Sequence, residues 1–545
     1  MTSLIRSITL KNFKGFSEEI RIDIKPITLL FGANSAGKSS VLQALQYVRE
    51  ILERNNANAD RTLQGGDAVD LGGFLNLVNG RDAKSQIEIE IGMELGSDSI
   101  PELVPEAFED WQTSDDDVWT FYESMQQVRR KVERLSVRLV IGWHEQREMP
   151  VVIGYEVATN DVWCVKIESS LYGRDTSMRL NHQNPIFLSE VSEEEQEISE
   201  DLLAELSGWV SEQDLGDADS IDSKKAPTYS ILPELLMAVR GVGMERPGDG
   251  LRSWLSDFNG ALPKLDKVLS IPVFGANGAS DIYIAREFTA FLSWLTIGPA
   301  MLLRDQLRQL RYIGPLRRIP PRGFAVSLTK SEAAWSDGMA AWESLMTGHQ
   351  GLVDLCSAWM SDADKLNTGY KLERQQTQEM DLNSLVPQPI GQPRTRIRLI
   401  DSAGLAHQPQ DVGVGISQVL PVVVAAQDGN GSVVCIEQPE LHVHPSVQVG
   451  LGDLLIEGAA QNGLSFLIET HSEHLILRIL RRIRETADGS IAPHLTKIGP
   501  HSVGVVYLNK IDGKVCVTPI PINEEGDFDT PWPTGFFEER GPELF

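Results

Sequence analysis

The sequence predicts an α/β fold with an antiparallel β subdomain and a helical insertion, and three observations support this prediction. Residues 26–31 form a continuous apolar run, typical of a strand buried on both faces, and a glycine-bounded loop and an amphipathic segment follow it. Several segments between residues 86 and 167 alternate polar and apolar residues, as antiparallel strands with one solvated face do. Between residues 231 and 348 the apolar residues recur mostly at helical spacing.

The N-terminal lobe, residues 1–175, is predicted to begin with strands. Alternation predicts strands over 5–10 and 20–24, and the buried strand at 26–31 follows them. Apolar residues three to four positions apart predict a helix over 39–52. Further alternating segments predict the antiparallel sheet at 86–93, 135–141, 151–157 and 162–167.

The middle of the chain, residues 176–390, is predicted to be an acidic and helical insertion. Residues 189–223 contain thirteen Asp and Glu and no Lys or Arg. Such a run is typical of a solvated face or loop, and an acidic docking surface is the alternative. Three prolines and a glycine within residues 385–393 predict a linker at its end.

The C-terminal lobe, residues 391–545, is predicted to return to alternating strands and helices. Two short apolar runs, at 433–436 and 465–468, are typical of buried strands. Asp512-Gly513 is a two-residue turn signal between two strand-like segments, which predicts a hairpin. The remaining expected elements are a strand at 396–400 and helices at 416–427, 445–456 and 475–485.

Length and charge limit the function. A chain of 545 residues is expected to form more than one structural unit. Its net charge of −28 argues against a protein that coats nucleic acid non-specifically, although a local basic groove stays possible. The four cysteines form no C-x-x-C pair, and no apolar segment is long enough to cross a bilayer. We therefore expect a cytoplasmic protein without a membrane anchor.

One predicted helix carries a row of arginines. Arg478, Arg481 and Arg482 are three to four residues apart and therefore lie on one helix face. They either bind the phosphates of DNA or RNA or pair with acidic residues of the middle segment or of a partner.

Residues 32–39, Gly-Ala-Asn-Ser-Ala-Gly-Lys-Ser, match the phosphate-binding pattern G-x-x-x-x-G-K-S between a buried strand and a helix. Glycines let backbone N–H groups wrap a phosphate, and the helix N-terminus adds its positive dipole end. Lys38 would reach the β- and γ-phosphates, and the Ser39 hydroxyl would ligate Mg²⁺. The pattern predicts an ATP site.

Three later segments complete such a site. The buried strand at 433–436 ends in Glu437, the acid expected to hold the metal, and the strand at 465–468 precedes His471. Residues 411–418 form a glycine-rich turn that opens a helix.

The set and order of these motifs resemble ATP-binding-cassette (ABC) ATPases of the SMC, RecF and overcoming-lysogenization-defect branch, in which N- and C-terminal segments form one head. The resemblance implies a homodimer, or a higher oligomer, in which two heads enclose two ATP molecules. It identifies residues 413–418 as the signature motif that contacts the ATP of the opposite subunit, and His471 as the switch histidine. The nucleotide contacts that it implies are Lys14, Asn34, Ser35, Ala36, Gly37, Lys38, Ser39, Ser40, Gly415, Ser417 and Gln418, and its metal contacts are Ser39 and Glu437.

Further segments resemble a bacterial subgroup of stand-alone ATPases with a C-terminal domain of unknown function. These segments are residues 312–317, 436–445, 469–474 and 532–545. Relatives often act in anti-phage defence, as the Septu-type ATPase does. The resemblance therefore implies a partner effector such as a nuclease.

One residue departs from the family pattern. The position after the metal acid, usually a glutamate that polarises the attacking water, is Gln438. An amide orients water but does not accept its proton, so we expect slow hydrolysis, with Glu440 or His471 as substitute proton acceptors.

Other interpretations compete with this one. Glu437, Glu440 and four nearby histidines also fit a transition-metal site. Asp527 and Asp529 form a D-x-D, which we interpret as a surface turn and not as a nuclease centre. The leading hypothesis is an ATP-gated dimeric switch that controls a separate effector. The alternatives are a RecF-like DNA-repair ATPase stimulated by DNA and a scaffold that binds ATP without turnover.

Overall fold

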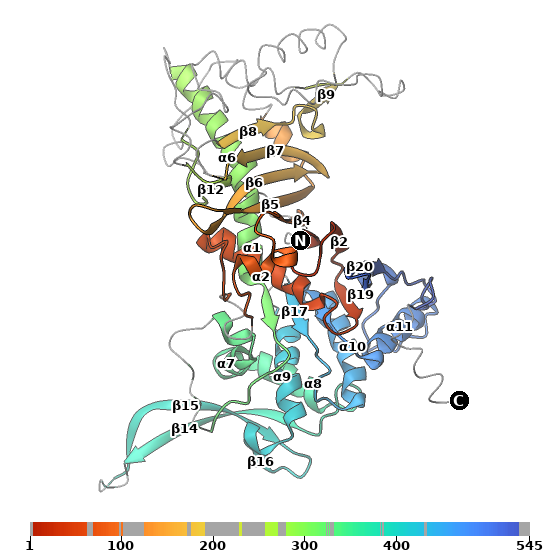
Figure 1. Cartoon of the computed structure of the whole chain (residues 1–545). Coiled ribbons are helices and arrows are strands. Elements are labelled where there is room, and N and C mark those ends of the chain that lie inside the picture. The colour runs from red at the N-terminus through yellow and green to blue at the C-terminus, as the bar shows by residue number, and fades with distance from the viewer. Residues whose placement is uncertain are drawn as a thin grey trace. The chain divides into compact units, whose positions relative to one another are not determined.

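The computed structural model describes residues 4–62, 69–96, 100–101, 125–171, 176–190, 228–230, 257–270, 279–322, 324, 326, 332–381, 383, 386–429 and 433–532. Most of the predicted acidic run, residues 191–223, lies outside this set. The chain divides into two compact units (Figure 1). Unit 1 comprises Met1–Phe13, Val48–Asn58 and Gly73–Arg308, and unit 2 comprises Lys14–Tyr47, Ala59–Gly72 and Gln309–Phe545.

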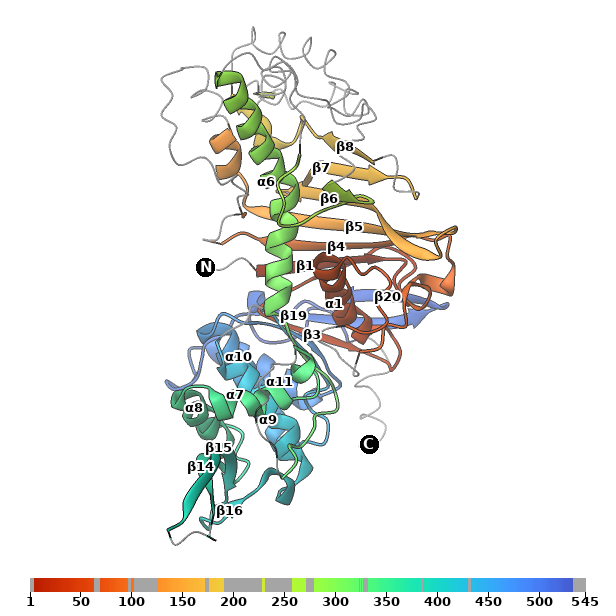
Figure 2. The ribbon, with the colours of Figure 1, turned by 90° about the vertical axis from the view of Figure 1, so that its left-hand side faces the viewer.

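Unit 1 contains the predicted antiparallel sheet. Neighbouring strands follow one another in the order β1, β4, β5, β6, β7 and β8 (Figure 2). Along β4 buried and partly exposed residues alternate, which is the pattern expected of a sheet with one face on the core. The strands are β1 (Leu4–Lys11), β4 (Ile87–Glu94), β5 (Arg134–His144), β6 (Met149–Thr159), β7 (Val162–Ser169) and β8 (Thr176–Leu180).

A long helix, α6 (Ala279–Gln309), packs against this sheet, and the Tyr155 hydroxyl of β6 donates a hydrogen bond to the Thr296 carbonyl of α6. The prediction of a mostly helical segment is thus confirmed for α6. The smaller described elements of unit 1 are α2 (Phe74–Leu77), β9 (Leu188–Glu190), β10 (Thr228–Ser230), β11 (Phe258–Asn259) and β12 (Leu262–Pro263).

Unit 2 contains a second sheet, in which the described strands have the order β13-β17-β18-β3-β19-β20. The strands from β13 to β19 are parallel, and β20 returns antiparallel to β19 as the predicted hairpin. The N-terminal strand β3 thus lies between two strands that come from the C-terminal part of the chain. The strands are β3 (Ile27–Gly32), β13 (Arg311–Ile313), β17 (Val433–Glu437), β18 (Ser465–Glu469), β19 (Val503–Ile511) and β20 (Lys514–Pro519).

Helices and buried strands form the core of unit 2. Every residue of β3, β17 and β18 is buried, which is why these strands are continuous apolar runs without alternation. The short strand β2 (Ile20–Asp23) contacts β20. The helices are α1 (Lys38–Arg54), whose first ten residues belong to unit 2, α7 (Met339–Thr347), α8 (Gln350–Ser361), α9 (Val414–Gln427), α10 (Pro445–Gln461) and α11 (Glu473–Ala487).

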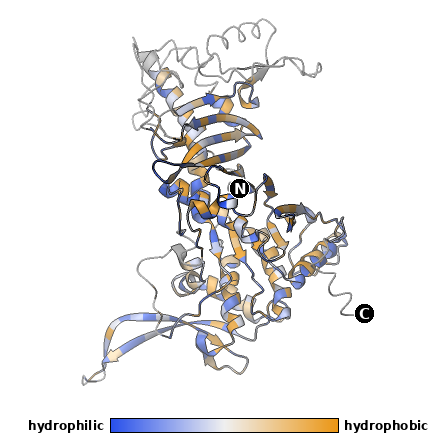
Figure 3. Ribbon diagram, viewed as in Figure 1, coloured by the Kyte–Doolittle hydropathy of each residue, from blue (hydrophilic) through white to orange (hydrophobic). Residues whose placement is uncertain are grey.

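The predicted linker at 385–393 was wrong for residues 388–393, which belong to β15 (Gln388–Ile400), one strand of a long two-stranded ribbon with β14 (Lys371–Asp381). β16 (Ala406–His407) extends it. The ladder skips residues 391–393, and the Gln378 amide donates hydrogen bonds to the carbonyls of Ile390 and Gly391 there. Pro393 lies in this skipped stretch, where no ladder hydrogen bond is lost, whereas Pro389 lies within the ladder opposite Met380. Figure 3 shows that the ribbon is mostly hydrophilic.

None of the helices within the described ranges is both long and apolar enough to cross a lipid bilayer.

Candidate functional site

The phosphate-binding loop lies between β3 and α1, as the motif predicts. Gly32 and Gly37 have φ angles of 141° and 98°, and Ser35 has 62°. A side chain at Gly32 is excluded, because a Cβ atom there would lie 1.9 Å from the Leu508 carbonyl oxygen. The loop therefore needs glycine where it leaves the sheet, and Ala33, Asn34 and Ser35 remain exposed.

Lys38 lies at the centre of the site and is 3% exposed. Its ammonium donates hydrogen bonds to the carbonyls of Gly32 (2.9 Å) and Ala33 (3.0 Å). It also lies 3.8 Å from a carboxylate oxygen of Glu469. Burial lowers the pKa of Lys38. The lysine thus folds back over the loop that would hold a phosphate.

Two carboxylates lie side by side at the ends of neighbouring strands. Glu437 and Glu469 are register partners of the parallel strands β17 and β18. The Tyr312 hydroxyl donates to Glu437 Oε1 at 2.7 Å, and the Ser39 hydroxyl donates to Glu469 Oε2 at 2.5 Å. Burial, and then repulsion from Glu469, raises the pKa of Glu437 to about 7. The motifs predicted Glu437 and Ser39, but Tyr312 and Glu469 were missed.

Glu440 connects the two loops that follow these strands. One of its oxygens accepts a hydrogen bond from the Thr470 hydroxyl at 2.8 Å, and the other accepts one from the His471 backbone N–H at 2.7 Å. Burial raises the pKa of Glu440. Burial and the charge of Lys38 lower the pKa of His471, which favours a neutral imidazole at neutral pH.

Gln438 directly follows Glu437 and has a left-handed backbone, with φ of 45°. Its N–H donates to the Glu469 carbonyl at 2.8 Å, which fixes the turn at the end of β17. A non-glycine residue in this conformation is uncommon and is concentrated at functional sites.

The signature segment opens α9, and the structure divides its residues between surface and interior. Gly413 and Val414 are exposed, whereas Ser417 and Gln418 are buried. The Gln418 amide and the Arg317 backbone exchange two hydrogen bonds, at 2.6 and 3.2 Å. A Cβ atom at Gly415 would lie 2.7 Å from the His442 carbonyl oxygen, so this glycine permits close packing.

Arg317 joins this segment to the end of strand β17. Its guanidinium donates to the carbonyls of Gln418 (3.1 Å) and Glu437 (2.8 Å). Burial lowers the pKa of Arg317 to about 10. Arg317 thus bonds to both the end of β17 and the first turns of α9.

The remaining predicted residues lie around this centre. Lys14 has a φ of 50°, and its ammonium donates to the side chain of Gln43. Burial lowers its pKa, while the charges of Asp70 and Glu437 oppose this effect. Ala36, in the loop, is buried. Ser40, in the first turn of α1, is partly exposed.

The competing metal interpretation finds no support. Among the residues that the structure describes, no group of three or more His, Cys, Asp or Glu is placed to hold a metal ion. His444 instead caps α10, because its ring nitrogen accepts the Ser446 N–H. Asp527 of the D-x-D pairs with Arg484 at an exposed turn.

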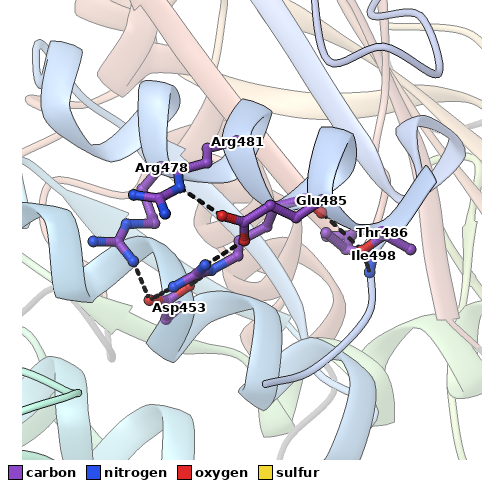
Figure 4. A network of polar contacts seen from close by, with 7 residues as sticks. Asp453, Arg478, Arg481, Glu485, Thr486 and Ile498 are labelled. Carbon is purple, nitrogen blue, oxygen red and sulfur yellow. Dashed lines mark hydrogen bonds and ion pairs between the residues drawn. The ribbon is translucent and has the colours of Figure 1, made fainter. Parts of the chain in front are cut away.

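The arginine row of α11 is held by acids of unit 2. Asp453 of α10 accepts hydrogen bonds from Arg482 (2.7 and 3.0 Å) and Arg478 (3.0 Å) (Figure 4). Glu485 accepts from Arg481 at 2.6 Å and from Arg482 at 2.5 Å. These partners belong neither to the middle segment nor to another protein. The row is a structural network and not a free basic surface.

The residues of the site fit a magnesium ion with a nucleotide. Mg²⁺ prefers hard oxygen donors and few protein ligands, and it keeps contacts for phosphate oxygens. Ser39 and Glu437 offer such oxygens beside the phosphate-binding loop, where carboxylates lie close together.

Comparison with known proteins agrees with this chemistry. Residues 4–136 match the family model described as an AAA ATPase domain. Residues 193–478, more than half of the chain, match the model described as an AAA domain, putative AbiEii toxin, Type IV TA system. No curated protein sequence is significantly similar to the chain.

Solved structures give distant likenesses. One is the SMC head domain from Thermotoga maritima, at 8% identity and a TM-score of 0.35, covering 96% of this chain and 100% of that one. Another is the Smc head domain with an extended coiled coil bound to the C-terminal domain of ScpA, derived from Pyrococcus furiosus. Its identity is 12% and its TM-score 0.37, and the match covers 95% of this chain and 97% of that one.

Proposed function

Because the chain belongs to the family described as an AAA domain, putative AbiEii toxin, Type IV TA system, and also matches an AAA ATPase domain, we propose that it is a cytoplasmic, ATP-gated dimeric switch of the SMC- and RecF-like ABC type with slow hydrolysis. The switch controls a separate effector, such as a nuclease, in bacterial anti-phage defence. The observation that carries the proposal is the cluster of Lys38, Ser39, Glu437 and Glu469 around the phosphate-binding loop.

ATP binding is assigned to the loop and the first turn of α1. Lys38 exchanges its two carbonyl partners for the β- and γ-phosphates, and Ser39 and Glu437 hold magnesium. A magnesium ion held by Ser39 and Glu437 would offset the negative charge that develops on the phosphate oxygens.

Slow hydrolysis follows from the residues near the end of β17. Gln438 does not accept a proton, and both oxygens of Glu440 already accept hydrogen bonds from the neighbouring loop. A neutral His471 is then the substitute proton acceptor, and its lowered pKa keeps it in the accepting form. Bound ATP thus holds the dimer closed, and slow hydrolysis keeps it in that state.

Dimer closure is assigned to the surface at the start of α9. Val414 and Leu316 are 48% and 69% exposed, which is high for apolar side chains, and both lie close in sequence to the bonded pair Arg317–Gln418. An apolar surface beside a helix N-terminus suits contact with the ATP-bearing face of a second copy.

The separate effector is proposed from the matched family. The description of the matched family names a toxin of a toxin–antitoxin system, which is one member of a pair of proteins. The test is co-purification of this chain with the products of neighbouring genes. Retention of a nuclease supports the proposal, whereas turnover that rises on adding DNA supports the repair ATPase instead.

The clamp is tested by Gln438→Glu. A positioned general base contributes about 10²–10⁴-fold to rate, so we expect this variant to hydrolyse ATP faster than wild type by a factor in this range. Phosphate release under single turnover measures it, and Gln392→Glu, at an exposed position of β15, controls for the added charge. If wild type hydrolyses ATP rapidly and Gln438→Glu hydrolyses it at the same rate, the proposal of slow hydrolysis with ATP as a clamp is wrong.

A further inference from the structure

We propose that Glu469 is a positioning residue for nucleotide-bound magnesium, acting through the hydroxyl of Ser39. This inference rests on the proposed function and assigns a role to a residue that the family motifs do not include. The carboxylate accepts the hydrogen bond of the serine hydroxyl, so the serine oxygen presents its lone pairs to the metal.

The hydrogen bond between the two residues carries the argument. Ser39 Oγ donates to Glu469 Oε2 at 2.5 Å. A hydroxyl has one proton and two lone pairs, and it rotates to suit its partner. With its proton directed to Glu469, the oxygen keeps both lone pairs for a cation. Outer carboxylates that orient a ligand in this way commonly tune metal affinity.

Rigid surroundings fix the carboxylate. Glu469 is 6% exposed and is the last residue of β18, a fully buried strand between β17 and β3. Its backbone carbonyl accepts the Gln438 N–H, and its second carboxylate oxygen faces the Lys38 ammonium at 3.8 Å. A group on the end of a central strand holds its geometry better than one on a loop.

The pairing also explains why Glu469 itself is not assigned as a direct ligand. One of its oxygens accepts the Ser39 hydrogen bond and the other is turned to Lys38, whereas Glu437 Oε1 accepts the Tyr312 hydroxyl and its carboxylate interacts with the charges of Arg317 and Lys14. The two carboxylates therefore have different tasks: Glu437 faces the metal and Glu469 orients the serine.

The test uses three single variants of the full chain and one double variant, which combines Ser39→Ala with Glu469→Gln. Glu469→Met keeps the length of the side chain but removes both oxygens, Glu469→Gln keeps one weaker acceptor, and Ser39→Ala removes the hydroxyl. Mn²⁺ serves as the probe, and its affinity for the protein–ATP complex is measured by electron paramagnetic resonance. ATP affinity in EDTA is measured beside it by calorimetry.

We expect the Mn²⁺ affinity to fall about 10–100-fold in Glu469→Met and less in Glu469→Gln. ATP affinity in EDTA should stay close to wild type in Glu469→Gln. Because Glu469 acts through Ser39, Glu469→Gln should cause no further loss of Mn²⁺ affinity when Ser39 is already Ala. Glu457→Gln, on α10, is the control. It alters a carboxylate that accepts the indole N–H of Trp359 on α8, and it should leave the metal affinity unchanged.

Two results would overturn the inference: Mn²⁺ affinity equal to wild type in Glu469→Gln and Glu469→Met, or full additivity of the Ser39 and Glu469 changes. Should Glu469→Met not fold, Glu469→Gln and the double variant decide alone. Failure of wild type to bind ATP at all would instead refute the proposed function, so the two failures are distinguishable.

Discussion

Two buried charged clusters of unit 2 differ in how their charges are matched. The helix cluster, Asp453, Arg478, Arg482 and Glu485, joins α10 to α11, and each of its carboxylates accepts hydrogen bonds from two arginines. The P-loop cluster, Lys38, Glu437, Glu440 and Glu469, places carboxylates beside one another around one lysine. In the first arrangement arginines match the carboxylates, whereas the second is the arrangement that the proposed binding of Mg²⁺ and ATP would use.

The electrostatic consequences separate the clusters. Hydrogen bonds to Asp453 and Glu485 raise the pKa of Arg482, so its charge is stabilised where it lies. In the P-loop cluster, burial raises the pKa of Glu437 and lowers that of Lys38, so both charged forms are disfavoured. Shifts in this direction are typical of binding and catalytic sites, whereas matched pairs are typical of structural networks.

The largest expected effect on stability is in the helix cluster. Asp453→Ala leaves two arginines without their shared acid, and breaking a buried pair costs about 3–5 kcal/mol. We expect a loss of this size in urea unfolding, with ATP affinity of the folded protein unchanged. Arg481→Ala is the matched control, because its ion pair is exposed and should contribute less than about 1 kcal/mol. A large loss of ATP affinity in Asp453→Ala would contradict the division into a structural helix cluster and an ATP-binding P-loop cluster.

A smaller effect is expected from pH in the P-loop cluster. The pKa of Glu437 rises from 4.5 to about 7 on folding, so the folded chain binds more protons than the unfolded chain between these values. Its contribution to stability therefore falls as pH rises through this window, by at most about 1.4 kcal/mol per pH unit. The unfolding free energy of wild type minus that of Glu437→Gln should therefore fall as pH rises from 4.5 to 7, by at most about 1.4 kcal/mol per pH unit. A difference that stays constant from pH 4.5 to 7 would contradict the assignment.

The motifs predicted Lys38, Glu437 and Glu440, three of the four residues of the P-loop cluster, and the reason is local. Gly32, Gly37, Lys38 and Ser39 belong to one short pattern whose spacing fixes its geometry, and Glu437 ends an apolar strand. Glu469 was missed because its partner Ser39 is 430 residues away in the sequence. Only the register of β18 between β17 and β3 brings the two together.

The helix cluster and the ribbon show the same limit. The spacing of Arg478, Arg481 and Arg482 predicted their shared helix face, but not Asp453, which lies on a different helix. The prolines near residue 390 predicted a break, whereas pairing with β14 carries the strand across it. Periodicity reports on one element at a time, and pairing between elements needs the fold.

The most direct test of the central claim is calorimetric titration of ATP into the protein with magnesium present. We expect one ATP per chain, and a loss of about 2–5 kcal/mol of binding free energy in Lys38→Ala, because the proposed function makes the buried Lys38 ammonium the main partner of the phosphates. Asp453→Ala should bind ATP as wild type does. Equal ATP affinity in wild type and Lys38→Ala would contradict the account.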